Sequence, residues 1–130
     1  MRKAFLLGTI LLFAFIVRIV GINEVPLYGD ELTITQDAYS ILQTGKDVTG
    51  KTLPLTFSMG AGRPGGYVYF SVPFVSLFGP GAYGVRMLSI ISGVGIVLAG
   101  YLLSRKLFSE KIAIITAFLT AISPWAINLS

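Results

Sequence analysis

Two neighbouring carboxylates, Asp30 and Glu31, are the residues of this chain whose type and position best suit proton-transfer chemistry. The chain has no histidine and no cysteine, so the imidazole and thiolate groups that often act as bases, nucleophiles or metal ligands are missing. Acid or base chemistry therefore falls to carboxylates, which can take the proton of a hydroxyl within hydrogen-bond reach. The pair lies a few residues beyond the first apolar run. If that run spans a bilayer, the two carboxylates lie at the membrane surface, where they could act on a lipid-borne substrate.

Composition places the chain among integral membrane proteins. It has 130 residues, of which 54% are hydrophobic and 12% charged, whereas soluble domains average about 25% charged residues. A net charge of +4 is also found in proteins that bind nucleic acid. However, the cations are scattered or flank apolar runs and form no basic stripe, so we predict no nucleic-acid binding and interpret them as topology signals.

The apolar runs predict an all-α integral membrane fold with three transmembrane helices. We place the helices at residues 4–22, 84–104 and 112–128, joined by a long outer loop over 23–83 and an inner loop over 105–111. A cleaved signal peptide is the alternative for the first run, but no small-x-small cleavage site follows it, so we prefer an uncleaved anchor. Lysine and arginine concentrate at the N-terminus and in the inner loop, and this predicts a cytoplasmic N-terminus.

The outer loop is expected to carry amphipathic juxtamembrane helices. Apolar residues recur at helical spacing after Glu31, and Gly45 is a natural helix stop, so we predict a surface helix capped by Asp30. Its expected apolar stripe comprises Leu32, Thr35, Tyr39 and Leu42, widened by Ala38 and Ile41. The apolar segment Tyr67–Phe78 is too short to cross a bilayer, so we predict a re-entrant or interfacial segment there.

The order and spacing of several short motifs resemble the C-type membrane glycosyltransferases. Within them, the chain looks like the branch that contains the dolichyl- or polyprenyl-phosphate-mannose protein mannosyltransferases and the aminoarabinose lipid A transferases. The matching residues are Pro26, Asp30, Glu31, Thr44-Gly45-x-Asp47-x-x-Gly50, Leu53-Pro54-Leu55-x-Phe57, Tyr67-x-Tyr69, Phe78-Gly79, Val85-Arg86-Met87-Leu88-Ser89, Leu107-Phe108 and Ser123-Pro124-Trp125. Together these motifs extend over nearly the whole chain.

The resemblance implies sugar transfer from a polyprenyl-phosphate donor to a hydroxyl of a lipid, glycan or protein. It implies that Asp30 lies at the reaction centre as general base, with Glu31 orienting Asp30 or the acceptor. It also implies a multi-pass protein of the prokaryotic plasma membrane or the endoplasmic reticulum, acting at the outer or lumenal face. A helix cap with a first-turn acid is the non-catalytic alternative for the pair.

Four residues of the outer loop and the following helix are predicted to bind substrate. Arg63 and Arg86 could hold the donor phosphate, because a guanidinium matches phosphate geometry. Tyr67 and Tyr69 could stack on the sugar or prenyl chain, and the alternative for them is an interfacial aromatic belt. Some relatives carry an acidic metal ligand before the Tyr-x-Tyr segment, but residues 60–66 here contain no carboxylate. We therefore predict no metal ligand and no cofactor, and leave dependence on a divalent metal open.

Three helices are fewer than an enzyme of this type is expected to need. We interpret residues 1–130 as the N-terminal part of a polytopic glycosyltransferase domain, with further transmembrane helices as partners, and expect the isolated chain to be inactive. The alternative is a non-catalytic small membrane subunit whose outer loop binds a partner protein. In that case, neutralising Asp30 should matter no more than neutralising Asp37 or Asp47.

Overall fold

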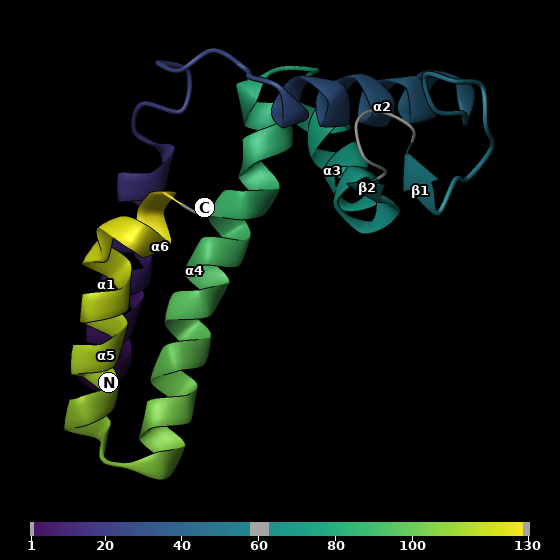
Figure 1. The fold of residues 1–130 in the computed structure, drawn as a ribbon. Helices are drawn as coiled ribbons and strands as arrows, with labels where there is room; N and C mark the ends of the chain where they lie inside the picture. The colour runs from purple at the N-terminus through teal and green to yellow at the C-terminus, as the bar shows by residue number, and fades with distance from the viewer. Residues whose placement is uncertain (1, 58–62, 129–130) are drawn as a thin grey trace. The chain divides into compact units, whose positions relative to one another are not determined.

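The computed structural model describes residues 2–57 and 63–128, and the chain is mostly helical, which confirms the predicted all-α class. The helices and strands in chain order are α1 (Arg2–Ile19), α2 (Asp30–Thr44), β1 (Thr56–Phe57), β2 (Arg63–Pro64), α3 (Gly65–Phe78), α4 (Ala82–Leu107), α5 (Glu110–Ile122) and α6 (Pro124–Asn128) (Figure 1). Two compact units result. We call residues 1–21 with 89–130 the three-helix unit, and residues 22–88 the α2–α3 unit.

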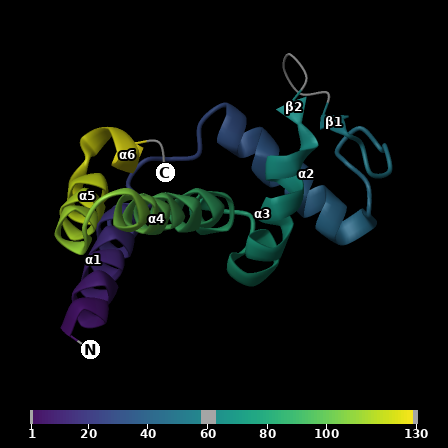
Figure 2. The same cartoon turned by 90° about the horizontal axis from the view of Figure 1, so that it is seen from below.

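The three-helix unit is held together by small side chains. Its core consists of Ile10 and Ala14 of α1, Val97 and Tyr101 of α4, and Ala113, Ala117 and Ala121 of α5. The four alanines are completely buried, and small residues let helix backbones approach closely, as is typical of helices packed within a membrane. Helices α1 and α5 lie side by side in both views of the ribbon (Figure 2).

One helix among the described residues, α4, is long and apolar enough to cross a membrane, judged by length and composition. Helix α1 has 18 residues and carries Arg2, Lys3 and Arg18. The structure divides the third apolar run into α5 and α6, because Ser123 adopts an extended conformation and Pro124 follows it. Proline lacks the N–H needed to continue a helix, which explains the break.

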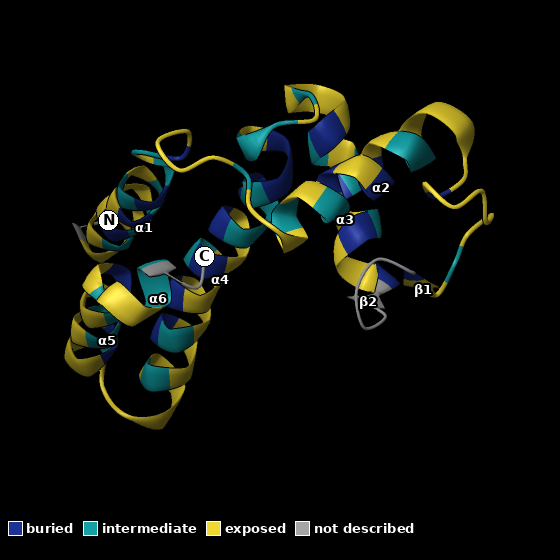
Figure 3. Cartoon of the chain, turned by 45° about the horizontal axis from the view of Figure 1, so that its top comes forward, coloured by how far each residue is buried: buried dark blue, intermediate teal, exposed yellow. Residues whose placement is uncertain are grey.

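The α2–α3 unit has its own apolar core between its two helices and the β1–β2 ribbon. Its members are Ala38, Phe57, Val68 and Val75, all at most 2% exposed. Strands β1 and β2 pair antiparallel, with Phe57 opposite Arg63. The buried colour of Figure 3 marks the faces of α2 and α3 that pack in this unit.

Helix α2 buries a face that matches the predicted stripe only in part. Ala38 and Thr35 are buried and Ile41 packs on the core, as predicted, but Leu32, Tyr39 and Leu42 are 45%, 42% and 39% exposed. Ile34, which the sequence did not place in the stripe, also packs on the core. The helix also begins one residue earlier than predicted, at Asp30, so Gly29 takes the N-cap position. The predicted short segment Tyr67–Phe78 forms most of α3, with Pro73 inside it.

Gly84, in the first turn of α4, lies where there is no room for a side chain. A Cβ at this position would lie 2.2 Å from the carbonyl oxygen of Gly79 and 3.2 Å from Val75. We expect Gly84→Ala to destabilise the protein by about 2–3 kcal/mol, as overpacking against backbone does, and thermal unfolding in detergent measures this. Gly81→Ala is the matched control, because its Cβ would meet nothing within 4 Å. Equal unfolding temperatures for the two variants would contradict this packing.

Candidate functional site

Asp30 and Glu31 lie in the first turn of α2, at the end of the segment that connects α1 to α2. Gly29 adopts φ +46°, a left-handed value that favours glycine and lets the helix start abruptly. Asp30 is exposed and Glu31 is half-buried. Two adjacent helical residues point about 100° apart around the helix axis. The two carboxylates therefore have different surroundings.

Arg86 of α4 holds Glu31 through a bidentate ion pair. The Nε atom of Arg86 donates to Oε1 of Glu31 at 2.7 Å, and Nη2 donates to Oε2 at 2.6 Å. The same guanidinium donates to three backbone carbonyls before α2: Ile22 at 2.5 Å, Val25 at 3.0 Å and Pro26 at 3.4 Å. These five bonds equal the five N–H donors of a guanidinium. Arg86 thus ties the start of α4 to the linker and to the first turn of α2.

The ion pair also sets the charge of Glu31. Its hydrogen bonds to Arg86 and the positive charge of that guanidinium lower the pKa of Glu31, while partial burial acts in the opposite direction. The carboxylate therefore stays ionised at neutral pH with both oxygens occupied by Arg86. Such a group is a poor proton acceptor for a substrate. Asp30 is the more exposed member of the pair.

Tyr67 and Tyr69, two other predicted substrate ligands, bond to backbone carbonyls. The hydroxyl of Tyr67 donates to the carbonyl of Val85 at 2.9 Å, and that of Tyr69 donates to the carbonyl of Pro54 at 2.9 Å. The ring of Tyr69 packs at 5.7 Å from that of Phe57. Both tyrosines therefore have structural partners, and their contact with a substrate stays a prediction. The side chain of Arg63 lies outside the described part of the structure.

Two further acids, Asp37 and Asp47, have structural roles in the turn that follows α2. Both are 3% exposed. Asp37 accepts a hydrogen bond from the N–H of Val48 at 3.2 Å, and Asp47 accepts from the N–H groups of Thr49 and Lys51 at 2.9 and 2.8 Å. Aspartate followed by a glycine three residues later is typical of a side-chain-capped turn, so the motif Asp47-x-x-Gly50 carried this signal.

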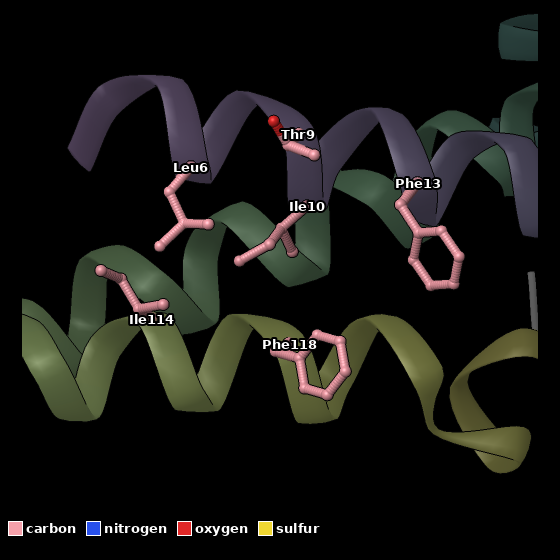
Figure 4. Close-up of a pocket in the computed structure, with 6 residues that line it drawn as sticks. All are labelled: Leu6, Thr9, Ile10, Phe13, Ile114 and Phe118. Carbon is pink, nitrogen blue, oxygen red and sulfur yellow. The ribbon is translucent and has the colours of Figure 1, made fainter. Parts of the chain in front are cut away.

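The three-helix unit contains an apolar groove of about 340 Å³ between α1 and α5 (Figure 4). Its lining residues are Leu6, Thr9, Ile10, Phe13, Ile114 and Phe118. The hydroxyl of Thr9 donates to the carbonyl of Phe5 within α1. The groove therefore offers no group for proton transfer. Among the described residues, no three histidine, cysteine or acidic side chains are grouped to hold a metal ion.

Comparison with known families gives one match. The family model described as dolichyl-phosphate-mannose-protein mannosyltransferase matches residues 63–130, which is more than half of the chain. The matched region contains α3, Arg86 and α4, whereas Asp30 and Glu31 precede it. No curated protein and no solved structure matches the chain.

Proposed function

Because the chain belongs to the dolichyl-phosphate-mannose-protein mannosyltransferase family, we propose that it transfers a sugar from a polyprenyl-phosphate donor to a hydroxyl acceptor, with Asp30 as general base. The main support for this proposal is that two adjacent carboxylates have different surroundings. Glu31 is held by Arg86 through both oxygens, and Asp30 is exposed beside it. Glu31 is thereby fixed in place by Arg86, and the exposed Asp30 is proposed to face the substrate.

In the proposed reaction, the acceptor oxygen attacks the anomeric carbon of the donor sugar. Its proton passes to the carboxylate of Asp30 as the new C–O bond forms, and the bond between the anomeric carbon and the phosphate oxygen breaks. The polyprenyl phosphate leaves with the electron pair of that bond. Asp30 then returns the proton to solvent. General-base assistance of this kind contributes about 10²–10⁴-fold to a rate.

Arg86 is proposed to act mainly through Glu31. Its donors are directed to Glu31 and to three carbonyls, so a donor phosphate would have to replace some of these acceptors. We propose that Arg86 and Glu31 position the first turn of α2, and with it Asp30. Arg63, Tyr67 and Tyr69 are proposed to contact the donor from the segment that leads into α3.

The membrane arrangement is part of the proposal. We propose spans at residues 4–22, 84–104 and 112–128, with 105–111 on the cytoplasmic side and 23–83 on the outer or lumenal side. The helix break at Ser123 and the 76% exposure of Trp125 support a third span that ends in this part of the chain. Tryptophan is enriched at membrane–water boundaries.

A transfer assay tests the proposed reaction. Membranes containing the protein are supplied with radiolabelled mannose on dolichyl or polyprenyl phosphate, and label in protein, glycan and lipid fractions is measured separately. Transfer above that of membranes lacking the protein is expected. A nucleotide sugar, supplied while synthesis of the lipid-linked donor is blocked, is the control. Transfer from that nucleotide sugar would overturn the proposed donor. The absence of transfer from any lipid-linked sugar would favour a non-catalytic subunit.

A further inference from the structure

The two leucines on either side of Pro54 have exposed side chains. Leu53 is 70% exposed and Leu55 is 88% exposed. They belong to the segment between α2 and β1, which lies in the α2–α3 unit. The chain bends at both leucines, and we call their two exposed apolar side chains the tip.

The backbone of this tip is held firmly. The carbonyl of Pro54 accepts the hydroxyl of Tyr69 at 2.9 Å, and the carbonyl of Leu55 accepts the N–H of Gly65 at 2.9 Å. Leu53 has φ +48° and is the one described residue other than glycine with a positive φ. Leucine rarely adopts this conformation, and strained positions of this kind persist only where the surroundings impose them. The surrounding structure therefore holds the backbone of Leu53 in an unfavourable conformation.

The outer face of α3 continues the apolar surface. Helix α3 contains no charged residue. One face, with Val68 and Val75, is buried in the core of the unit, while Phe70 and Leu77 are 70% and 76% exposed. These two are seven residues apart and share the opposite face. An uncharged helix with one face packed and the other open suits a hydrocarbon environment better than water.

We propose that Leu53 and Leu55 insert among the lipid acyl chains at the membrane surface, next to the outer face of α3. The occupant is lipid because the exposed side chains of Leu53, Leu55, Phe70 and Leu77 are apolar, and acyl chains need no directional partner. The unit is also joined to a candidate membrane helix. The first turns of α4, the helix long enough to cross a bilayer, belong to this unit, and Tyr67 of α3 bonds to Val85 there. The proposal requires a membrane protein but not the proposed reaction.

Single-cysteine labelling tests this insertion directly, because the chain has no cysteine of its own. The full protein carrying Leu55→Cys is labelled with an environment-sensitive fluorophore in phosphatidylcholine–phosphatidylglycerol liposomes. We expect nitroxide groups on the upper acyl chains to remove most of the emission, and aqueous iodide to have little effect. Lys46→Cys, at an exposed and charged position of the same unit, is the control and should show the reverse pattern.

A second reporter at Leu77→Cys, on the outer face of α3, is expected to respond as Leu55→Cys does. Leu53→Asn is the complementary variant, because asparagine tolerates positive φ but is polar. It should move the Leu55 reporter toward water, with a red shift and stronger iodide quenching. Iodide quenching of Leu55→Cys equal to that of the control would overturn the proposal. Protection from both quenchers would also overturn it, since the tip would then be covered by protein.

Discussion

Asp30→Asn is expected to reduce glycosyl transfer by about two orders of magnitude or more at matched protein levels. Asparagine keeps the shape of the side chain but cannot accept a proton as a base. Asp30 is exposed in the first turn of α2, so the substitution should leave the unfolding temperature nearly unchanged. Transfer from the lipid-linked donor and thermal unfolding, measured on the same preparation, separate a chemical effect from a folding effect.

The matched control for this variant is Glu24→Gln. Glu24 is an exposed acid in the segment between α1 and α2, six residues before Asp30. No described contact places it at the candidate site. Asp37 and Asp47 are unsuitable controls because they are buried acceptors of backbone N–H groups, so their loss would loosen the turn that follows α2. Unchanged transfer by Asp30→Asn would remove Asp30 from the role of base.

Exchanging the charges of Glu31 and Arg86 in a double variant is not expected to restore the stability that each single variant loses. Glu31→Gln or Arg86→Met should each destabilise the protein by about 2 kcal/mol, below the ~3–5 kcal/mol for breaking a fully buried pair, because the side chain of Glu31 is 36% exposed. The double variant Glu31→Arg with Arg86→Glu restores opposite charges. It also places a carboxylate beside the carbonyl oxygens that now accept from Arg86, so stability and transfer should stay low.

The exposed ion pair between Lys3 and Glu110 is the control for this exchange. Its atoms lie 3.1 Å apart, and the side chain of Lys3 is 68% exposed. Exposed pairs contribute little to stability, so Lys3→Glu with Glu110→Lys should be tolerated. Thermal unfolding and transfer are measured for both exchanges. Full recovery in the Glu31–Arg86 exchange would show that charge attraction alone matters there, and that the three carbonyl contacts do not.

The same geometry predicts how Arg86→Lys behaves. Lysine keeps the charge but provides three donors from one point, so it cannot satisfy two carboxylate oxygens and three carbonyls together. Its stability should lie between that of the wild type and that of Arg86→Met. This ordering tests the positioning role of Arg86 separately from the role of Asp30 as base.

The sequence alone determined the class of protein, most of the helices and the location of the candidate acids. These features depend on local patterns: long apolar runs, glycines that end helices, and charges that flank the runs. The helix after Gly29, the short helix before Gly79 and the long apolar helix after it all formed close to the expected residues. The resemblance to the mannosyltransferases also came from short motifs in order, and the family match over residues 63–130 agrees with it.

Tertiary structure decided which side chains meet. Glu31 and Arg86 are 55 residues apart in the sequence, and no local pattern links a first-turn acid to an arginine in a distant apolar run. For the same reason, the sequence did not predict that Arg86 pairs with Glu31 or that Asp37 and Asp47 are buried. Side-chain periodicity shows that α2 has an apolar face, but the packing of α3 and Phe57 selects which of its residues are covered. Burial and pairing are properties of contacts between distant segments, and only the folded chain supplies them.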